Sequence, residues 1–402
     1  MSIPVILSLI MHLKGARRIE GLATKLLPTF SLVQLGIALG ILMTGLAAAC
    51  GASATPAATE NSANRQTPQE QTTSHQAPDA THAPPASTRS LGSVPASGPV
   101  TLEEVARLDI GRSFAVTGGI INGTPYAFVG GAGVVQAIDL SAPEAPKAVG
   151  EIDVRNGVDG LFLDGERLYE TDSVGSRLRI IDVSDPASPR ELGFADIEGA
   201  PHGLFVQGNR AFVTDQSGRL WVIDVSNPAA PRELGTVWRA GETRGVFVQG
   251  DYVFISDALG GLRVIDVSNP TTPVEGASPR YAGGHRGDDI SVQGNYAFVA
   301  DGAAGLLVVD VSDPTSPRDI GSIRTTGEVN GVFLQNSYAF VIDQAGGLWA
   351  LDVSDPTSPR EAGFVHTPGD TKDLFVLENY ALAAYVTGEE GGLVVVAVSG
   401  PP

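Results

Sequence analysis

One sequence motif, Leu-x-Val-Ile-Asp-Val-Ser-Asn/Asp-Pro-x-x-Pro, occurs six times in recognisable form, and a degenerate seventh copy ends the chain. Its aspartate marks the period of the repeat, with gaps of 43, 42, 42, 44, 42 and 45 residues between successive copies. The equivalent positions are Asp139, Asp182, Asp224, Asp266, Asp310, Asp352 and Ala397. A period of about 40–45 residues that contains several strands is typical of the blades of a β-propeller.

Each repeat has the pattern of four short strands. In the copy that spans residues 203–239, the β-rich runs cover residues 204–206, 210–214, 220–225 and 233–238. A Gly-Asn pair between the first two runs fits a tight hairpin. The third run is almost wholly apolar, as expected when neighbouring sheets cover both faces of a strand. One repeat therefore predicts one four-stranded blade.

The two ends of the repeat region complement each other. Residues 103–110 match a fourth strand, although no first strand has yet appeared, and the chain ends with a third strand at residues 393–398 followed by Ser-Gly-Pro-Pro. The first strand then supplies the outer edge of the last blade and removes an edge open to aggregation. We therefore predict an all-β fold for residues 101–402, a seven-bladed β-propeller of four-stranded blades whose ring is closed by the N-terminal strand.

The repeats resemble the LVIVD-repeat family over residues 101–402. The resemblance implies a β-propeller of exported or surface proteins in bacteria and archaea, mostly of unassigned molecular function. Ala397 departs from the pattern at the turn after the last blade. The segments that carry the resemblance are Leu178-Arg-Ile-Ile-Asp182, Leu220-Trp-Val-Ile-Asp224, Leu262-Arg-Val-Ile-Asp266, Leu306-Leu-Val-Val-Asp310 and Leu348-Trp-Ala-Leu-Asp352.

The N-terminus has the pattern of an export signal. Residues 1–49 contain a basic region and then a mostly apolar run that ends in small residues, directly before Cys50, the single cysteine. The junction resembles a bacterial lipobox, which implies that Cys50 is lipidated and anchors the protein to the outer face of a membrane. Ala47 stands where the lipobox more often has Leu, so ordinary cleavage and secretion remain an alternative, and a retained transmembrane helix is a third.

The segment 50–100 that follows Cys50 is rich in Ala, Thr, Ser, Pro and Gln and has few large apolar side chains. Such a segment cannot bury enough surface to offset the entropy of ordering, so we predict a disordered tether. The formal net charge of −19 opposes contact with phosphate backbones, and we expect no nucleic-acid partner. We expect a monomer that meets the membrane only through its lipid.

Two repeated sets of aspartates have a structural explanation. The aspartate of the repeat motif opens a turn and is expected to accept hydrogen bonds from backbone amides. A second set ends each second strand before a Gly-containing turn, at Asp172, Asp215, Asp257, Asp301 and Asp343. The ligand spacing of a calcium loop is absent, so we predict neither a metal site nor a cofactor.

Function in a repeat protein is better sought where the repeats differ in chemistry. One position, two residues before the apolar start of each first strand, is polar in every copy. It holds Thr117, Asp159, His202, Arg244, Asp288, Asn330 and Lys372. Since first strands line the axis of a propeller, we expect these side chains to converge at the mouth of the central channel. They form either a binding site for a polar small molecule or peptide or a ring that merely solvates the channel mouth.

No sequence motif of a hydrolase, metalloprotease or nucleotide-binding protein occurs. The first hypothesis is therefore a surface-anchored, non-catalytic module that binds a protein, peptide or glycan outside the cytoplasm. The second is an extracytoplasmic hydrolase or lyase, with an acid–base set at the channel mouth drawn from Asp159, His202, Arg244 and Asp288. The third is a structural spacer.

Overall fold

The structure, a computed structural model, describes residues 98–400 except 240, 259–260 and 277–286. The predicted signal at residues 1–49, the lipidation site Cys50 and almost all of the predicted tether lie outside the described residues. Within the described ranges, no helix has the length and apolar character that a membrane crossing needs.

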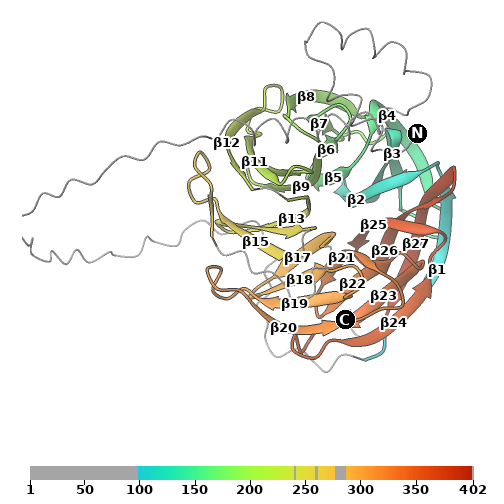
Figure 1. Ribbon diagram of the computed structural model, residues 1–402. Helices are drawn as coiled ribbons and strands as arrows, with labels where there is room; N and C mark the ends of the chain where they lie inside the picture. Colours follow the sequence, from blue (N-terminus) through green and yellow to red (C-terminus); the bar gives the residue numbers. More distant parts are fainter. Residues whose placement is uncertain (1–97, 240, 259–260, 277–286, 401–402) are drawn as a thin grey trace, which may run out of the picture. The chain divides into compact units, whose positions relative to one another are not determined.

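Seven antiparallel sheets stand around a central axis, and each sheet is one blade (Figure 1). The first strand of every blade lies nearest the axis and the fourth lies at the rim. The first three blades are β2 (Ser113–Ile121), β3 (Thr124–Asp139) and β4 (Lys147–Gly157); β5 (Gly160–Asp164), β6 (Arg167–Asp172), β7 (Arg177–Asp182) and β8 (Arg190–Asp196); and β9 (Pro201–Gln207), β10 (Arg210–Asp215), β11 (Arg219–Asp224) and β12 (Arg232–Trp238). The next three are β13 (Thr243–Gln249), β14 (Tyr252–Asp257), β15 (Gly261–Asp266) and β16 (Val274–Glu275); β17 (Asp289–Gln293), β18 (Tyr296–Ala300), β19 (Leu306–Asp310) and β20 (Arg318–Ile323); and β21 (Val329–Gln335), β22 (Tyr338–Asp343), β23 (Gly347–Asp352) and β24 (Arg360–His366). The seventh combines β25 (Asp370–Leu377), β26 (Tyr380–Thr387) and β27 (Glu390–Ser399) with β1 (Thr101–Asp109) from the start of the described chain.

The predicted ring closure is confirmed. In the last blade the strand order is β1-β27-β26-β25, and β1 pairs antiparallel with β27 from Thr101 opposite Ser399 to Asp109 opposite Gly392. Figure 1 shows this pairing at the rim, where the first and last colours of the described chain run side by side. The all-β, seven-bladed architecture read from the repeat is thus the fold of the described chain.

The first blade also follows the four-strand plan, although its second and third strands are joined without a break and form one element, β3. Its first half pairs with β2 and its second half pairs with β4. The backbone N–H of Leu140 donates to the carbonyl oxygen of Pro125 at 2.9 Å, as Val183 donates to Glu166 at 2.9 Å in the next blade. β3 therefore contains the second and third strands of its blade in a single hairpin.

The hydrophobic core lies between neighbouring blades. One cluster joins Leu178 and Ile180 of the second blade to Leu204 and Val213 of the third, and six similar clusters continue around the described ring. Third strands are therefore covered on both faces, which explains their nearly continuous apolar sequence. Each blade depends on its neighbours, and closure of the ring completes the last of these interfaces.

The proline-rich turn of each repeat packs against the preceding blade. A Cβ added to Gly193 in β8 would lie 2.5 Å from the carbonyl oxygen of Pro228, and one added to Gly321 in β20 would lie 2.4 Å from that of Pro356. These contacts leave no room for a side chain. Glycine in the fourth strand and proline in the following turn are thus two halves of one inter-blade contact.

The aspartate of the repeat motif has the predicted structural role. Asp182 accepts a hydrogen bond from the backbone N–H of Ser184 at 2.9 Å and pairs with Arg190 at 2.7 Å. Asp224 does the same with Ser226 and Arg232. These hydrogen bonds hold the pKa of both carboxyls at about 2.

The second aspartate set is buried and ties the turn after each second strand. Asp343 accepts hydrogen bonds from the backbone N–H groups of Ala345 and Gly347, both at 3.0 Å, and from the indole N–H of Trp349 at 2.9 Å. In the third blade, the indole of Trp221 donates to Asp215 at 3.1 Å. Asp343 and Asp215 thus stabilise their turns, as predicted, and donors of the protein itself occupy both oxygens of each carboxylate.

Candidate functional site

A local irregularity of the first strands places the variable residue. In β9, Leu204 pairs with Val213 but Pro201 pairs with Asp215, so His202 and Gly203 stand outside the regular pairing. A Cβ on Gly203 would lie 2.0 Å from the carbonyl oxygen of Arg244 in the next blade. The next strand therefore approaches closely, and the residue before the glycine is directed away from the sheet. Register shifts at equivalent positions occur in β13, β21 and β25.

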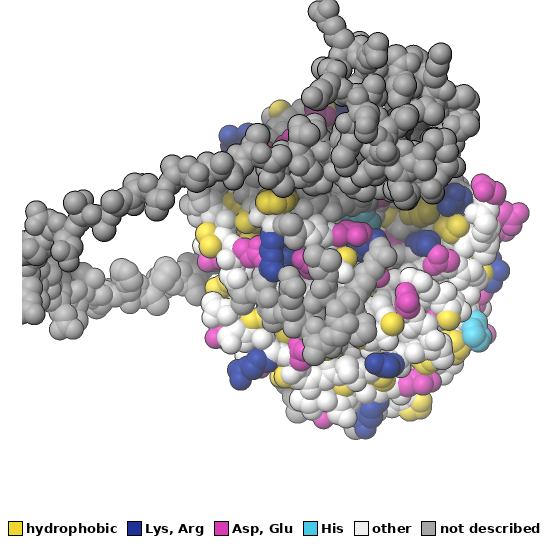
Figure 2. Space-filling view, in the orientation of Figure 1, with side chains coloured by type: hydrophobic (Ala, Val, Ile, Leu, Met, Phe, Trp, Pro, Cys, Tyr) yellow, Lys and Arg dark blue, Asp and Glu magenta, His cyan; other side chains and the backbone are white. Residues whose placement is uncertain are grey.

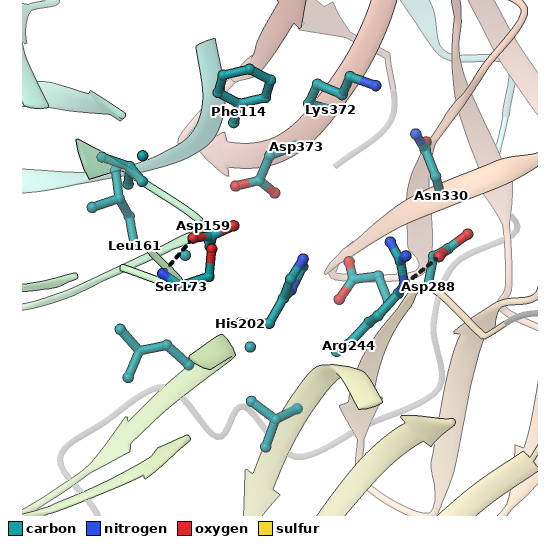
Figure 3. A pocket seen from close by; sticks show the side chains of 18 of the residues that line it. Phe114, Asp159, Leu161, Ser173, His202, Arg244, Asp288, Asn330, Lys372 and Asp373 are labelled. Carbon is teal, nitrogen blue, oxygen red and sulfur yellow. Dashed lines mark hydrogen bonds and ion pairs between the residues drawn. The ribbon is translucent and has the colours of Figure 1, made fainter. Parts of the chain in front are cut away.

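A cavity of about 610 Å³ opens at this end of the ring, and residues of all seven blades line it (Figure 3). Six of the seven residues predicted to converge are among them. They are Asp159, His202, Arg244, Asp288, Asn330 and Lys372. Figure 2 shows acidic, basic and histidine side chains close together near the middle of the face that this view presents.

Thr117 is the exception. It pairs with Phe128 inside the regular ladder of β2, its exposed fraction is 4%, and it does not line the cavity. The other six residues lie five positions before the last residue of their strand, and in β2 that position is Val116. The irregularity of β2 also falls earlier, between Ser113 and Ala115, so the first blade contributes Phe114 to the cavity instead.

The two cationic side chains of the cavity are paired with carboxylates. Arg244 contacts Glu242 at 2.7 Å and Asp288 at 3.3 Å. Lys372 pairs with Asp370, and Figure 3 shows its side chain extending away from Asp373. Across the cavity, Asp159 accepts a hydrogen bond from the backbone N–H of Ser173 at 2.8 Å.

Two further carboxyls, Asp289 and Asp373, lie one position after the predicted ring. Asp289 accepts the backbone N–H of Ile290 at 2.7 Å and, from the next blade, that of Val332 at 2.9 Å. Asp373 accepts the backbone N–H of Leu374 at 2.8 Å and, across the junction with the first blade, that of Val116 at 2.8 Å. Both side chains therefore bridge neighbouring first strands while they line the cavity.

Burial raises the pKa of Asp289 to about 6 and that of Asp373 to about 7. The bonds from backbone N–H groups oppose this shift, whereas the charge of Asp288 adds to it at Asp289 and the charge of Asp289 adds to it at Asp373. The two carboxyls thus titrate close to neutral pH.

The sequence contained a signal for these two residues that the prediction did not use. Counted from the predicted residues, the position after the variable one is glycine in five copies, at Gly118, Gly160, Gly203, Gly245 and Gly331. Only the fifth and seventh blades carry a carboxyl there. A carboxyl at a close inter-blade contact, where other blades have glycine, indicates a candidate site residue as well as variation at the polar position does.

A family model for the LVIVD repeat matches residues 173–196, 198–238, 240–278, 284–325, 326–367 and 368–402, more than half of the chain. This chain belongs to the LVIVD-repeat family. Thr117 and Asp159 lie before the first matched residue, Ser173 in the second blade, although the geometry of the ring continues through the first blade.

Among solved structures, this LVIVD-repeat propeller is similar to the β-propeller domain of Cps50 (Swd1) from Myceliophteria thermophila, at 11% sequence identity and a TM-score of 0.61. The likeness covers 74% of this chain and all of that domain and supports the propeller fold alone. No curated protein matches the chain.

In the described part of the LVIVD-repeat ring, no three His, Cys, Asp or Glu side chains gather closely enough to hold a metal ion. The cavity instead offers hydrogen-bond donors and acceptors next to apolar surface, a combination that suits an organic ligand.

Proposed function

We propose that this chain is a surface-anchored, non-catalytic LVIVD-repeat propeller that binds a protein, peptide or glycan partner through the cavity at the channel mouth. The observation that carries the proposal is the convergence on one cavity of six polar side chains of five residue types, each from a different blade. Folding does not require these differences, because the shared positions of the repeat already account for the blades.

The size and lining of the cavity support this proposal. Its volume of about 610 Å³ falls within the range of pockets that enclose organic ligands or the end of a peptide. Phe114 and Leu161 add apolar surface beside the polar groups. A ligand can therefore gain both apolar burial and specific hydrogen bonds in one place.

A five-residue variant tests the cavity as the binding site. Replacement of Asp159, His202, Arg244, Asp288 and Lys372 by Ser or Asn should leave folding nearly intact, because partly exposed ion pairs contribute only about 0–1 kcal/mol each. Capture of the partner that wild-type protein retains from an envelope extract should fall at least tenfold, about 1.4 kcal/mol. Quantitative mass spectrometry of the retained material measures this loss.

A matched control changes two cations and two anions on exposed outer strands. It replaces Lys147, Glu233, Arg318 and Glu361 by Ser and should capture the partner at wild-type strength. Full capture by the five-residue variant would contradict the proposed site and direct attention to the outer faces of the blades.

The raised pKa values of Asp289 and Asp373 favour a second candidate function, a hydrolase or lyase with an acid–base site in the same cavity. Both carboxyls are held by two backbone N–H groups each, which is sufficient to explain them as inter-blade supports. Incubation of the captured partner with wild-type protein distinguishes the two functions, since an enzyme converts its partner and a binding module releases it unchanged.

The surface location in this proposal rests on the sequence before residue 51. Replacement of Cys50 by Ser should move the protein from the membrane fraction to the medium, because the thiol that accepts the lipid is lost. Fractionation and immunoblotting measure the distribution. Retention of the Ser variant in the membrane fraction would identify the apolar segment itself as the anchor.

A further inference from the structure

The charges that line the cavity do not balance. The lining includes four carboxyls, those of Asp159, Asp288, Asp289 and Asp373, against the two cations Arg244 and Lys372. The cations are already paired, Arg244 with Glu242 and Asp288 and Lys372 with Asp370. The cavity therefore has an excess of negative charge that its own cations do not compensate.

Three of these carboxyls accept hydrogen bonds from backbone N–H groups and are not paired with cationic side chains. Asp159 accepts the N–H of Ser173, and Asp289 and Asp373 each accept two backbone N–H groups. They come from the second, fifth and seventh blades, and all three line the same space. Figure 3 shows the carboxyls of Asp159 and Asp373 facing each other across one side of the cavity. A positive group placed between them would gain charge-assisted hydrogen bonds.

An apolar wall stands beside Asp159. Phe114 and Leu161 line the cavity on this side (Figure 3), and Val174, with an exposed fraction of 73%, lines it too. Ser173, the residue before Val174, donates its backbone N–H to Asp159. Apolar surface and carboxylate are thus adjacent, so a ligand that reaches the carboxylate passes along the apolar surface.

We propose that the ligand of this cavity presents a protonated primary amine on an alkyl chain, with the ammonium group between Asp159 and Asp373 and the chain against Phe114, Leu161 and Val174. This inference rests on the proposed binding function and specifies its chemistry. A lysine side chain of a peptide and a small free alkylamine share this chemistry, and the experiment below separates them.

The pKa values of the carboxyls give the proposal a pH dependence. Asp289 and Asp373, with pKa values of about 6 and 7, are protonated in acid and charged above neutral pH. A cation binds the charged forms, so its affinity should rise with pH through this range. His202, Asp159, Asp288, Arg244 and Lys372 complete the titratable and charged groups that face the ligand.

Calorimetric titration of the full chain tests the proposal with defined probes. The probes are acetyl-Gly-Lys-Gly-amide, the same peptide with norleucine or Glu in place of Lys, and n-butylamine. At pH 8 the lysine peptide should bind at least tenfold more tightly than the norleucine peptide, which keeps the alkyl chain but lacks the charge. Its affinity should fall at least tenfold at pH 5.5.

Protein variants locate the effect. Asp159→Asn and the double change with Asp373→Asn retain hydrogen-bond acceptors and should each weaken the lysine peptide, the double variant by at least tenfold. The control Glu233→Gln with Glu361→Gln removes the same charge from exposed outer strands and should bind as wild type does. Melting curves verify that each variant is folded, and Asp159→Asn alone suffices if the double variant is not.

Each outcome of these titrations has one meaning. Equal binding of the lysine and glutamate peptides, or unchanged binding by folded Asp159→Asn, overturns the amine assignment. If the five-residue variant nevertheless loses the envelope partner, the proposed function stands and only this assignment fails. Tighter binding of the peptide than of n-butylamine identifies a peptide source, and equal binding identifies a free amine.

Discussion

Removal of residues 101–110 turns the closed ring into an open one, and the shortened chain should aggregate. The deleted strand β1 forms eight residue pairs with β27, which is then left as an unpaired edge. Residues Leu393, Val394, Val395 and Val396 of β27 are fully buried in the closed ring. A long apolar edge of this kind pairs readily with other chains.

The deletion also removes side chains from two inter-blade interfaces. Leu102 belongs to the core cluster between the sixth and seventh blades, and Leu108 packs against the cluster between the seventh and first. The segment just before β1 remains, and its Val100 contacts the sixth blade through a 2.9 Å hydrogen bond to Ala362. A Cβ on Gly363 would lie 2.3 Å from the carbonyl oxygen of Val100, so this segment makes the close contact with a fourth-strand glycine that proline turns make at Gly193 and Gly321.

Size-exclusion chromatography and thermal unfolding measure the result, with deletion of residues 51–96 as the control. The control should remain a monomer with an unchanged Tm, because its sequence predicts a tether without a core. A synthetic peptide of residues 98–110 added during refolding should restore the monomer of the shortened chain. A soluble monomer with wild-type Tm after deletion of residues 101–110 would exclude closure by β1 as a source of stability.

The fold could be predicted because one signal is repeated seven times. A single short strand is ambiguous, but in-register copies average out local exceptions such as Ala397. A fourth strand at residues 103–110, before any first strand, then predicted ring closure. Only a closed ring pairs this extra strand with a last blade that has no fourth strand of its own. The structure confirms both inferences.

The candidate site was predicted less completely, and the physical reasons differ between residues. Thr117 lies inside the regular ladder because the irregularity in β2 falls earlier than in the other first strands, and the place of this irregularity depends on backbone pairing. Asp289 and Asp373 were missed because the prediction compared only the polar position. Convergence of the remaining six followed from ring geometry alone, which places equivalent residues of different blades around one axis.

A buried ionic cluster in the second blade is a second feature that the repeat pattern conceals. Glu170 in β6 is fully buried, and its carboxyl lies 3.4 Å from the guanidinium of Arg179, which also contacts Asp172 at 3.4 Å. Neither oxygen of Glu170 has a hydrogen-bond partner. In the five following blades the position of Glu170 is apolar, with Val213, Ile255, Val299, Val341 and Ala383.

Replacement of Arg179 by Met should lower the free energy of unfolding by about 3 kcal/mol or more, because the carboxylate of Asp172 would stay buried and lose its cation. Replacement of Glu170 by Val should be neutral or stabilising. Two other blades carry Trp at the position of Arg179, and the indole N–H groups of Trp221 and Trp349 donate hydrogen bonds to Asp215 and Asp343. A Trp in place of Arg179 should donate to Asp172 in the same way. The pair Glu170→Val with Arg179→Trp should therefore restore wild-type stability, and failure to do so would contradict this account.

The stability of the wild-type chain should fall as the pH rises, and Glu170→Val should remove the part of this fall that Glu170 causes. Burial raises the pKa of Glu170 from 4.5 to about 8, against the opposing charge of Arg179 and with the added charges of Asp172, Asp159 and Glu191. Between these two values the folded chain holds a proton that the unfolded chain has released, so each rise in pH favours unfolding by about 1 kcal/mol per unit.

Denaturant unfolding at pH 5 and pH 8 measures this contribution as the difference between wild type and Glu170→Val. The variant should gain roughly 2–4 kcal/mol relative to wild type on passing from pH 5 to pH 8. Asp289 and Asp373 also have raised pKa values, but they are present in both proteins and their contributions cancel in the difference. A difference that does not change with pH would mean that Glu170 is charged throughout, and Arg179 would then compensate its burial in full.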